Sequence, residues 1–245
     1  MRYAVLSDIH SNLVALEAVL ADLADASIDR YLCLGDIVGY GARPNQCCDV
    51  MRELGAICVR GNHDEAAVDT SKAEWFTAPA RACILWTSEQ LRPDNRELLG
   101  ALPSVRVVAG DITLCHGSIP DPDHYTVSPA DALLSLAAMT THIGFFGHTH
   151  YSEWFIADGD GQLPSEHPIP AGGRLRTENG HLYLVNPGAV GQPRDGNELV
   201  SYAIYDDDSG EIVIRRVAYD IAKTAQQMRA AGLPEAMYAR LWLGV

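Results

Sequence analysis

The chain has 245 residues, of which 47% are hydrophobic and 20% charged, a composition that allows one sizeable folded core and argues against a disordered or fibrous protein. Its 32 acidic and 18 basic residues give a formal net charge of −14, so the surface repels polyanions and long nucleic acid is not an expected partner. No apolar stretch is long enough to span a membrane and the six cysteines show no CxxC spacing, so we expect a cytoplasmic protein with reduced thiols and no membrane partner.

The first sixty residues alternate apolar runs with amphipathic stretches. Residues 3–6, 31–34 and 56–59 are predicted to form strands, and residues 12–25 and 44–54 to form the helices between them. Because successive strands joined by helices lie parallel in a sheet, this order predicts an α/β fold that begins with a parallel sheet.

The middle of the chain is predicted to add helices and further strands. Residues 70–102 have helical spacing and are expected to form an insertion over one side, with a buried face made of Trp75, Phe76, Ile84, Leu85 and Trp86. Residues 105–108 and 112–115 predict a hairpin, and residues 143–146 predict a buried strand.

The last third of the chain is predicted to form a second sheet. Residues 164–180 are rich in glycine and proline, which predicts a long loop. The alternating runs 182–185, 202–205 and 212–217 predict a sheet made mostly of antiparallel pairs. Residues 221–243 predict short helices whose apolar side chains cover that sheet.

Polar side chains follow five of the predicted strands, at the point where each strand ends. In chain order the segments are Ser7-Asp8-Ile9-His10-Ser11-Asn12, Gly35-Asp36, Gly61-Asn62-His63-Asp64, His116-Gly117 and Gly147-His148-Thr149-His150. Ligands of α/β sheets bind beyond the carboxyl ends of the strands. We therefore expect these segments to converge on one rim of the fold, although they are scattered along the chain.

The donor atoms in these segments suit divalent transition metals. Carboxylates, an amide oxygen and imidazoles form a mixed ligand set that favours Mn, Fe, Zn, Ni or Co over Ca or Mg. Seven candidates are too many for one tetrahedral ion and predict two ions that share one carboxylate: Asp8, His10, Asp36, Asn62, His116, His148 and His150. Two dications against two carboxylates leave a local charge of about +2, which favours a small phosphorylated substrate.

The order of the segments resembles the motifs of the calcineurin-like metallophosphoesterase superfamily, which are D-x-H, G-D, G-N-H-D/E, H-G and G-H-x-H. Residues 186–195, Asn-Pro-Gly-Ala-Val-Gly-Gln-Pro-Arg-Asp, look like the NPGSVGQPRD segment of its small bacterial phosphodiesterase-like branch. The resemblance implies an α/β fold, namely a four-layer α/β/β/α sandwich of two mixed sheets flanked by helices. Since no linker divides the chain, we expect residues 1–245 to form a single domain.

The resemblance also implies a role for each motif residue. One metal would be held by Asp8, His10 and His150, the other by Asn62, His116 and His148, with Asp36 as the bridge. His63 would bind no metal and would donate a proton to the leaving-group oxygen.

Two further residues are candidates for substrate binding. Arg194 lies between glycine and proline residues and is expected to bind phosphate, with a solvated loop residue as the alternative reading. Asn12 either contacts the substrate or caps the first helix. In the five-coordinate state of phosphorus, the two ions, Asn62 and Arg194 would stabilise the added charge.

The expected activity is that of a dinuclear metal-dependent phosphodiesterase that hydrolyses a small or nucleotide diester with a metal-bound hydroxide. In the protein phosphatase branch the second motif reads G-D-x-V-D-R-G, whereas residues 35–41 read Gly-Asp-Ile-Val-Gly-Tyr-Gly, so the arginine that clamps a monoester is absent. The alternatives are a phosphomonoesterase, a nucleotide pyrophosphatase of the diadenosine tetraphosphatase type and, disfavoured by the intact ligands, a non-catalytic scaffold. The physiological substrate, the native metal and assembly into a homo-oligomer stay open.

Overall fold

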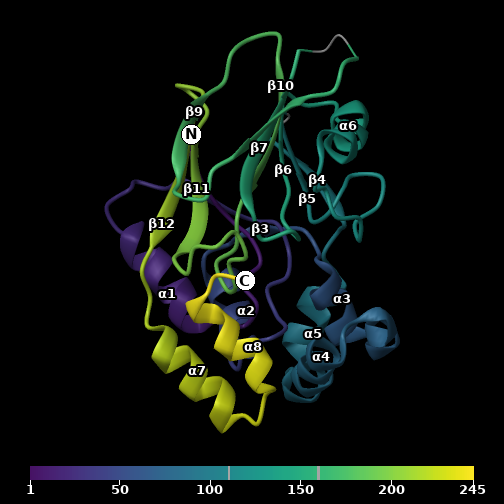
Figure 1. Cartoon of the computed structure of the whole chain (residues 1–245), viewed down its shortest axis with the longest axis vertical. Coiled ribbons are helices and arrows are strands. Elements are labelled where there is room, and N and C mark those ends of the chain that lie inside the picture. Colours follow the sequence, from purple (N-terminus) through teal and green to yellow (C-terminus); the bar gives the residue numbers. More distant parts are fainter. Residues whose placement is uncertain (110, 159–160) are drawn as a thin grey trace.

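The computed structural model describes residues 1–109, 111–158 and 161–245, and within them it contains two six-stranded mixed sheets packed face to face (Figure 1). The first sheet has the strand order β3 (Ile57–Cys58), β2 (Arg30–Cys33), β1 (Arg2–Leu6), β11 (Val200–Asp206), β12 (Glu211–Val217) and β9 (Gly173–Arg176). The second has the order β4 (Val105–Val108), β5 (Ile112–Cys115), β6 (Ile143–Phe145), β10 (Leu182–Pro187), β7 (Ser152–Ala157) and β8 (Ser165–Pro168).

Side-chain alternation along the strands places one hydrophobic core between the sheets and a further core on the outer face of each sheet. On β1, Tyr3 and Val5 pack against the second sheet, while Ala4 and Leu6 face the helices on the other side. The outer helix layer of the first sheet contains α1 (Leu13–Asp22) and α2 (Pro44–Glu53). On the second sheet it contains α6 (Pro129–Ala138), whose Leu136 packs with Phe155. These layers confirm the predicted four-layer α/β/β/α sandwich.

The remaining helices gather beyond one end of the sheets (Figure 1). They are α3 (Asn62–Val68), the 3₁₀ helix η1 (Thr70–Trp75), α4 (Ala78–Gln90), α5 (Pro93–Gly100), α7 (Ile221–Ala230), α8 (Glu235–Ala239) and η2 (Arg240–Trp242). No helix in the described part of the chain is long and apolar enough to cross a membrane.

The predicted membership of the second sheet is wrong in one respect. The runs at 202–205 and 212–217 form β11 and β12, which extend the first sheet because β11 pairs antiparallel with β1, Tyr3 opposite Tyr205. Only the run at 182–185 belongs to the second sheet, as β10. An alternating pattern indicates a half-buried strand and carries no information about its neighbour.

The predicted loop at 164–180 contains two strands, β8 and β9, one at the edge of each sheet. All four residues of β8 are exposed. Edge strands of this kind lack the apolar face from which a strand is recognised in a sequence.

Two expectations about burial are also wrong. Trp75, predicted to be buried, has 94% of its surface exposed. The apolar residues of the last helices do not cover the second sheet, because α7 packs on α1 and α8 packs on α4. There Met228, Met237 and Leu241 form a separate cluster with Cys83 of α4.

Candidate metal centre

The five motif segments meet at one end of the sandwich, where the strands that precede them end. Five of the seven candidate ligands are non-glycine residues with φ between 49° and 68°: Asp8, His10, Asp36, His148 and His150. This left-handed conformation is unfavourable for residues with a Cβ and is concentrated at functional sites. The surrounding packing therefore imposes an unfavourable backbone conformation on these five residues.

The first group of candidate ligands consists of Asp8, His10 and His150, all buried. Asp8 Oδ1 is 3.3 Å from His150 Nε2 and 3.9 Å from His10 Nε2. The same oxygen has no hydrogen-bond partner among the described residues, although it is fully buried. A buried carboxylate oxygen without a donor is unfavourable by itself and suits a cation ligand.

The second group consists of Asn62, His116 and His148. His116 Nε2 is 3.1 Å from Asn62 Oδ1 and 3.1 Å from His148 Nδ1. Asp36 lies between the groups, because its Oδ2 is 3.6 Å from His10 Nε2 and 3.4 Å from His116 Nε2. One carboxylate oxygen is thus shared by both sets of histidines.

Hydrogen bonds to main-chain carbonyls determine which nitrogen each histidine presents. The Nδ1 hydrogens of His10, His116 and His150 are donated to the carbonyls of Val38, Leu34 and Gln192, at 3.2, 2.8 and 2.5 Å. His148 is reversed, since its Nε2 donates to the Asp123 carbonyl at 3.2 Å. The second ring nitrogen of each histidine faces the site and would present a lone pair to a bound metal, which is the arrangement found around protein-bound metals.

These lone pairs provide a test of whether the residues fit a metal. His10 Nε2 and His150 Nε2 are 3.1 Å apart, and neither carries a hydrogen when both Nδ1 atoms donate. Two lone pairs at this distance repel each other, and a cation that both can bind removes the repulsion. The donor set therefore fits divalent transition-metal ions.

Burial and the two carboxylates dominate the electrostatics of the groups when no cation is present. Burial lowers the pKa of His148 to about 3, and His116 adds to this effect. For His116 burial acts in the same direction, but the adjacent Asp36 and Asp8 outweigh it and raise its pKa to about 10. Burial would raise the pKa of Asp36, yet His116, His63 and His10 hold it well below the ordinary value.

His63 lies beside the ligand groups on the first turn of α3. Its main-chain N–H donates to Asp36 Oδ1 at 2.8 Å, and its ring lies between those of Tyr40 and Phe76, with centroids 4.4 and 4.7 Å away. Gly39 has a φ of 98°, and a Cβ on it would lie 2.4 Å from His63 Nδ1. Glycine at this position is therefore what leaves room for the imidazole.

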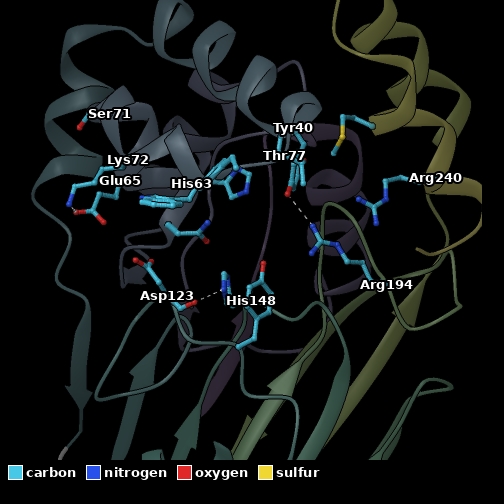
Figure 2. Close-up of a pocket in the computed structure, with 16 residues that line it drawn as sticks. Tyr40, His63, Glu65, Ser71, Lys72, Thr77, Asp123, His148, Arg194 and Arg240 are labelled. Atoms are coloured by element: carbon cyan, nitrogen blue, oxygen red, sulfur yellow. Dashed lines mark hydrogen bonds and ion pairs between the residues drawn. The ribbon is translucent and has the colours of Figure 1, made fainter.

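A cavity of about 630 Å³ opens beside these residues and is lined by Asn62, His63 and His148 of the motifs. Figure 2 shows Arg194 on one side of the cavity, where its Nη2 donates to the Tyr40 hydroxyl at 3.2 Å. Among the described residues Arg194 has no carboxylate within 4 Å, so its positive charge is available to an anion in the cavity.

Asn12 occupies the second of its two predicted roles, that of the cap of the first helix. Its Oδ1 accepts from the Ala15 N–H and the Thr224 hydroxyl, and its Nδ2 donates to the Gly191 carbonyl. It caps α1, connects it to α7 and the 186–195 segment, and does not line the cavity.

Several residues near the site did not follow from the sequence. Tyr40 and Phe76 enclose His63, and Arg240 of η2 lines the cavity. Asp64 accepts from the main-chain N–H groups of Val38 and Gly61, both at 3.1 Å, and thus ties the second and third motifs together. Asp64 and Tyr40 lie in the third and second motifs and Phe76 in a predicted apolar face, whereas Arg240 had no sequence signal.

Comparison with known proteins agrees with this geometry over nearly the whole chain. Residues 1–210 match the calcineurin-like phosphoesterase superfamily domain. The protein MJ0912 of Methanocaldococcus jannaschii is 36% identical over 98% of this chain and 97% of its own length. The phosphodiesterase YfcE of Escherichia coli (strain K12) is 25% identical over 92% of this chain and 98% of its own.

A solved structure has the same fold throughout. The crystal structure of a metallophosphoesterase from Sphaerobacter thermophilus superposes with a TM-score of 0.90 and 42% identity, covering 100% of this chain and 99% of the other. The motifs, the two groups of ligands around a shared carboxylate and these matches lead to one conclusion. The chain belongs to the calcineurin-like phosphoesterase superfamily and is a metal-dependent phosphoric ester hydrolase.

Proposed function

We propose that this protein is a dinuclear phosphodiesterase that hydrolyses a small or nucleotide diester. The observation that carries the proposal is the position of Asp36 Oδ2, within 3.6 Å of a histidine nitrogen from each group, beside a cavity large enough for a small ligand. The similarity to YfcE, which is named a phosphodiesterase, supports the choice of reaction.

The two ions are proposed to be Mn, Fe, Zn, Ni or Co, held by Asp8, His10 and His150 on one side, by Asn62, His116 and His148 on the other, and by Asp36 between them. When bound, such a pair supplies Lewis acidity for the phosphate oxygens and lowers the pKa of water to give a nucleophile near neutral pH. The Nδ1–H···O=C bonds of His10, His116 and His150 orient their rings for this task.

His63 is proposed to hold the proton that the leaving group requires. Burial lowers its pKa to about 4, with Arg194, His150 and His116 adding to this effect, while Asp36 acts in the opposite direction. A phosphate anion in the cavity raises that pKa by Coulomb attraction. His63 would therefore take up its proton together with the substrate and deliver it to the departing alkoxide.

Arg194 and Asn62 are proposed to contact the phosphate. Both line the cavity, and Arg194 is held there by the Tyr40 hydroxyl and Gln192 Oε1, two neutral acceptors. Its charge would stabilise the negative charge that builds up on the phosphoryl oxygens.

The preference for a diester follows from the second motif. Gly39 and Tyr40 occupy the positions at which protein phosphatases carry the Asp-Arg pair, so no arginine of this motif clamps a monoester dianion. A diester has one negative charge and a second organic arm, for which the cavity has room. We further propose that residues 1–245 form one domain that works in the cytoplasm on small phosphorylated substrates and not on long nucleic acid, in line with its charge of −14.

The decisive experiment compares bis(p-nitrophenyl) phosphate with p-nitrophenyl phosphate, using protein reconstituted separately with each metal. We expect a higher kcat/KM for the diester. The Arg194→Ala variant should lose activity on both substrates, and Arg176→Ala, which changes an exposed arginine on β9, serves as the matched control. If the monoester is cleaved at least as efficiently and Arg194→Ala removes only that activity, the protein is a phosphomonoesterase and Arg194 replaces the missing clamp.

A further inference from the structure

Trp75 is the most exposed large apolar side chain of the described residues, with 94% of its surface in contact with solvent. It is the last residue of η1 and lines the same cavity as the metal ligands Asn62 and His148. Covering an exposed indole ring with an apolar surface is favourable, because it removes apolar area from water. No other part of the described protein covers this ring. The ring is therefore available to a ligand that enters the cavity.

Phe76, the residue after Trp75, lies next to the proposed general acid. Phe76 also lines the cavity, and its ring centroid is 4.7 Å from that of His63. Two aromatic residues next to each other in the chain thus line the cavity, one in contact with the proposed general acid and one exposed to solvent. An arm of a substrate whose phosphate lies near His63 would pass along both.

The polar groups beside Trp75 indicate what kind of arm this is. Ser71 and Lys72 of η1 and Glu65 of α3 line the same cavity, and Figure 2 shows them grouped away from Arg194 and Arg240. Glu65 Oε1 is 3.9 Å from Lys72 Nζ and 3.6 Å from Arg60 Nη2, so this side of the cavity offers Lys72 as a donor and Glu65 as an acceptor. An arm that is a flat aromatic ring with hydrogen-bonding groups at its edge matches an indole flanked by a donor and an acceptor. An aliphatic arm has no polar edge for these groups.

We propose that Trp75 and Phe76 form a stacking subsite for a nucleobase, so that the organic arm of the diester is a nucleoside. The inference rests on the proposed phosphodiesterase function and names its substrate class. The indole gives a sequence-tolerant stacking surface, because every base has a π-face, and Lys72 and Glu65 meet the base edge.

The test uses two diesters with the same leaving group, thymidine 5′-(p-nitrophenyl phosphate) and ethyl p-nitrophenyl phosphate. Since nitrophenolate departs from both, the chemical step is matched and only the arm differs. Trp75→Ala should reduce kcat/KM for the thymidine ester about 5- to 150-fold, mainly through KM, as expected for the loss of one stacked base. Activity on the ethyl ester should stay unchanged, and Trp75→Phe should retain part of the advantage.

Trp242→Ala is the matched control, because Trp242 is also exposed, at 48%, and does not line the cavity. It should leave both esters unaffected. Equal kinetics of wild type and Trp75→Ala on the thymidine ester, or equal losses on both esters, would overturn the subsite while leaving the phosphodiesterase function in place.

Binding of the product separates failure of the subsite from failure of the function. Calorimetry with thymidine 5′-monophosphate and with inorganic phosphate on the metal-loaded protein needs no turnover. We expect Trp75→Ala to weaken the nucleotide and not the phosphate. If neither diester is cleaved, the phosphodiesterase proposal is wrong, and the nucleotide titration still decides whether Trp75 binds a base.

Discussion

His63 differs from the ligand histidines in the way its ring is held. Each proposed ligand histidine donates the hydrogen of one ring nitrogen to a main-chain carbonyl, whereas His63 Nδ1 is buried without a hydrogen-bond partner among the described residues. Contacts with Tyr40 and Phe76 position the ring instead. A ring held by packing leaves its nitrogens free to exchange a proton, which is what a general acid requires.

The His63→Asn variant tests this role. It should retain its metal content and lose about 10²- to 10⁴-fold in kcat on a diester with an alkoxide leaving group, because proton donation is removed while the Lewis acids stay. The loss should be small for p-nitrophenyl esters, whose leaving group needs no proton. Metal analysis and kinetics with the two leaving groups check this, and equal losses for both, or loss of metal, would assign His63 another role.

Asp36 contacts more of the candidate site than the other carboxylate does, because its two oxygens have different partners. Oδ2 lies between the histidine groups, and Oδ1 accepts from the main-chain N–H of His63. Asp36→Asn should lower metal content well below that of the wild type and reduce activity more than about 100-fold, since an amide is a much weaker bridge between cations. Plasma emission metal analysis is the measurement, with the exposed Asp25→Asn as control. Unchanged metal content would exclude Asp36 as the bridging ligand.

At the scale of secondary-structure elements, short turns at the strand ends bring the proposed ligands together. Gly61, the residue before α3, packs directly on the proposed bridging residue Asp36, since a Cβ there would lie 2.0 Å from Asp36 Oδ1. The start of α3 can therefore approach the end of β2 closely enough for the His63 N–H to reach the carboxylate. The first turn of α3 thus carries both Asn62 and His63 to the carboxylate of Asp36.

Strand β7 contains a buried acid that the proposed reaction does not use. Glu153 is 6% exposed, and burial, with Glu166 and Asp195 adding to it, raises its pKa from 4.5 to about 8. The unfolded chain loses this proton near pH 4.5 while the folded chain keeps it to about pH 8, so the free energy of unfolding falls as pH rises through that range.

Glu153→Gln removes this titration. We expect the variant to be more stable than the wild type by about 1–3 kcal/mol at pH 8 and equally stable below pH 4.5, measured by urea unfolding at both pH values. Glu178→Gln changes an exposed glutamate and should have no effect at either pH. A stability difference that does not vary with pH would show that Glu153 is ionised in the folded protein.

At the scale of the whole molecule, a buried ion pair joins the two sheets near the site. Arg216 of β12 pairs with Asp195, and the same guanidinium donates to the Ser152 hydroxyl of β7 at 2.8 Å. The side chains of Arg216 and Asp195 are 5% and 6% exposed. Since Asp195 follows Arg194 in the chain, the pair also holds the segment that carries Arg194 into the cavity.

Arg216→Met should destabilise the protein by about 3–5 kcal/mol, because it leaves the Asp195 carboxylate buried without a counter-ion. The measurement is the midpoint of urea unfolding at pH 7. The double variant with Asp195→Asn should recover part of the loss, since the uncompensated charge is then gone. A single variant as stable as the wild type would show that water solvates Asp195 and that the pair does not join the sheets.

The sequence by itself determined the parts of this protein that are encoded locally. Strand-end motifs such as Gly147-His148-Thr149-His150 combine an apolar run, a tight turn and candidate ligand side chains within a few residues, so the candidate ligand set could be proposed, and the parallel start of the fold and the family inferred, from short windows. The four-layer architecture followed from the family resemblance.

Only the tertiary structure decided the features that depend on contacts between distant segments. The pairing of β11 with β1 and the packing of α7 on α1 join opposite ends of the chain, and no local pattern specifies such partners. For the same reason the structure was needed to show that Asn12 caps a helix, since its other partners are the distant Thr224 and Gly191. The exposure of Trp75 was also not predictable, because it results from the lack of an element packed against the ring. Burial is a property of the whole packed chain, and apolar spacing predicts it only where another element supplies the opposing surface.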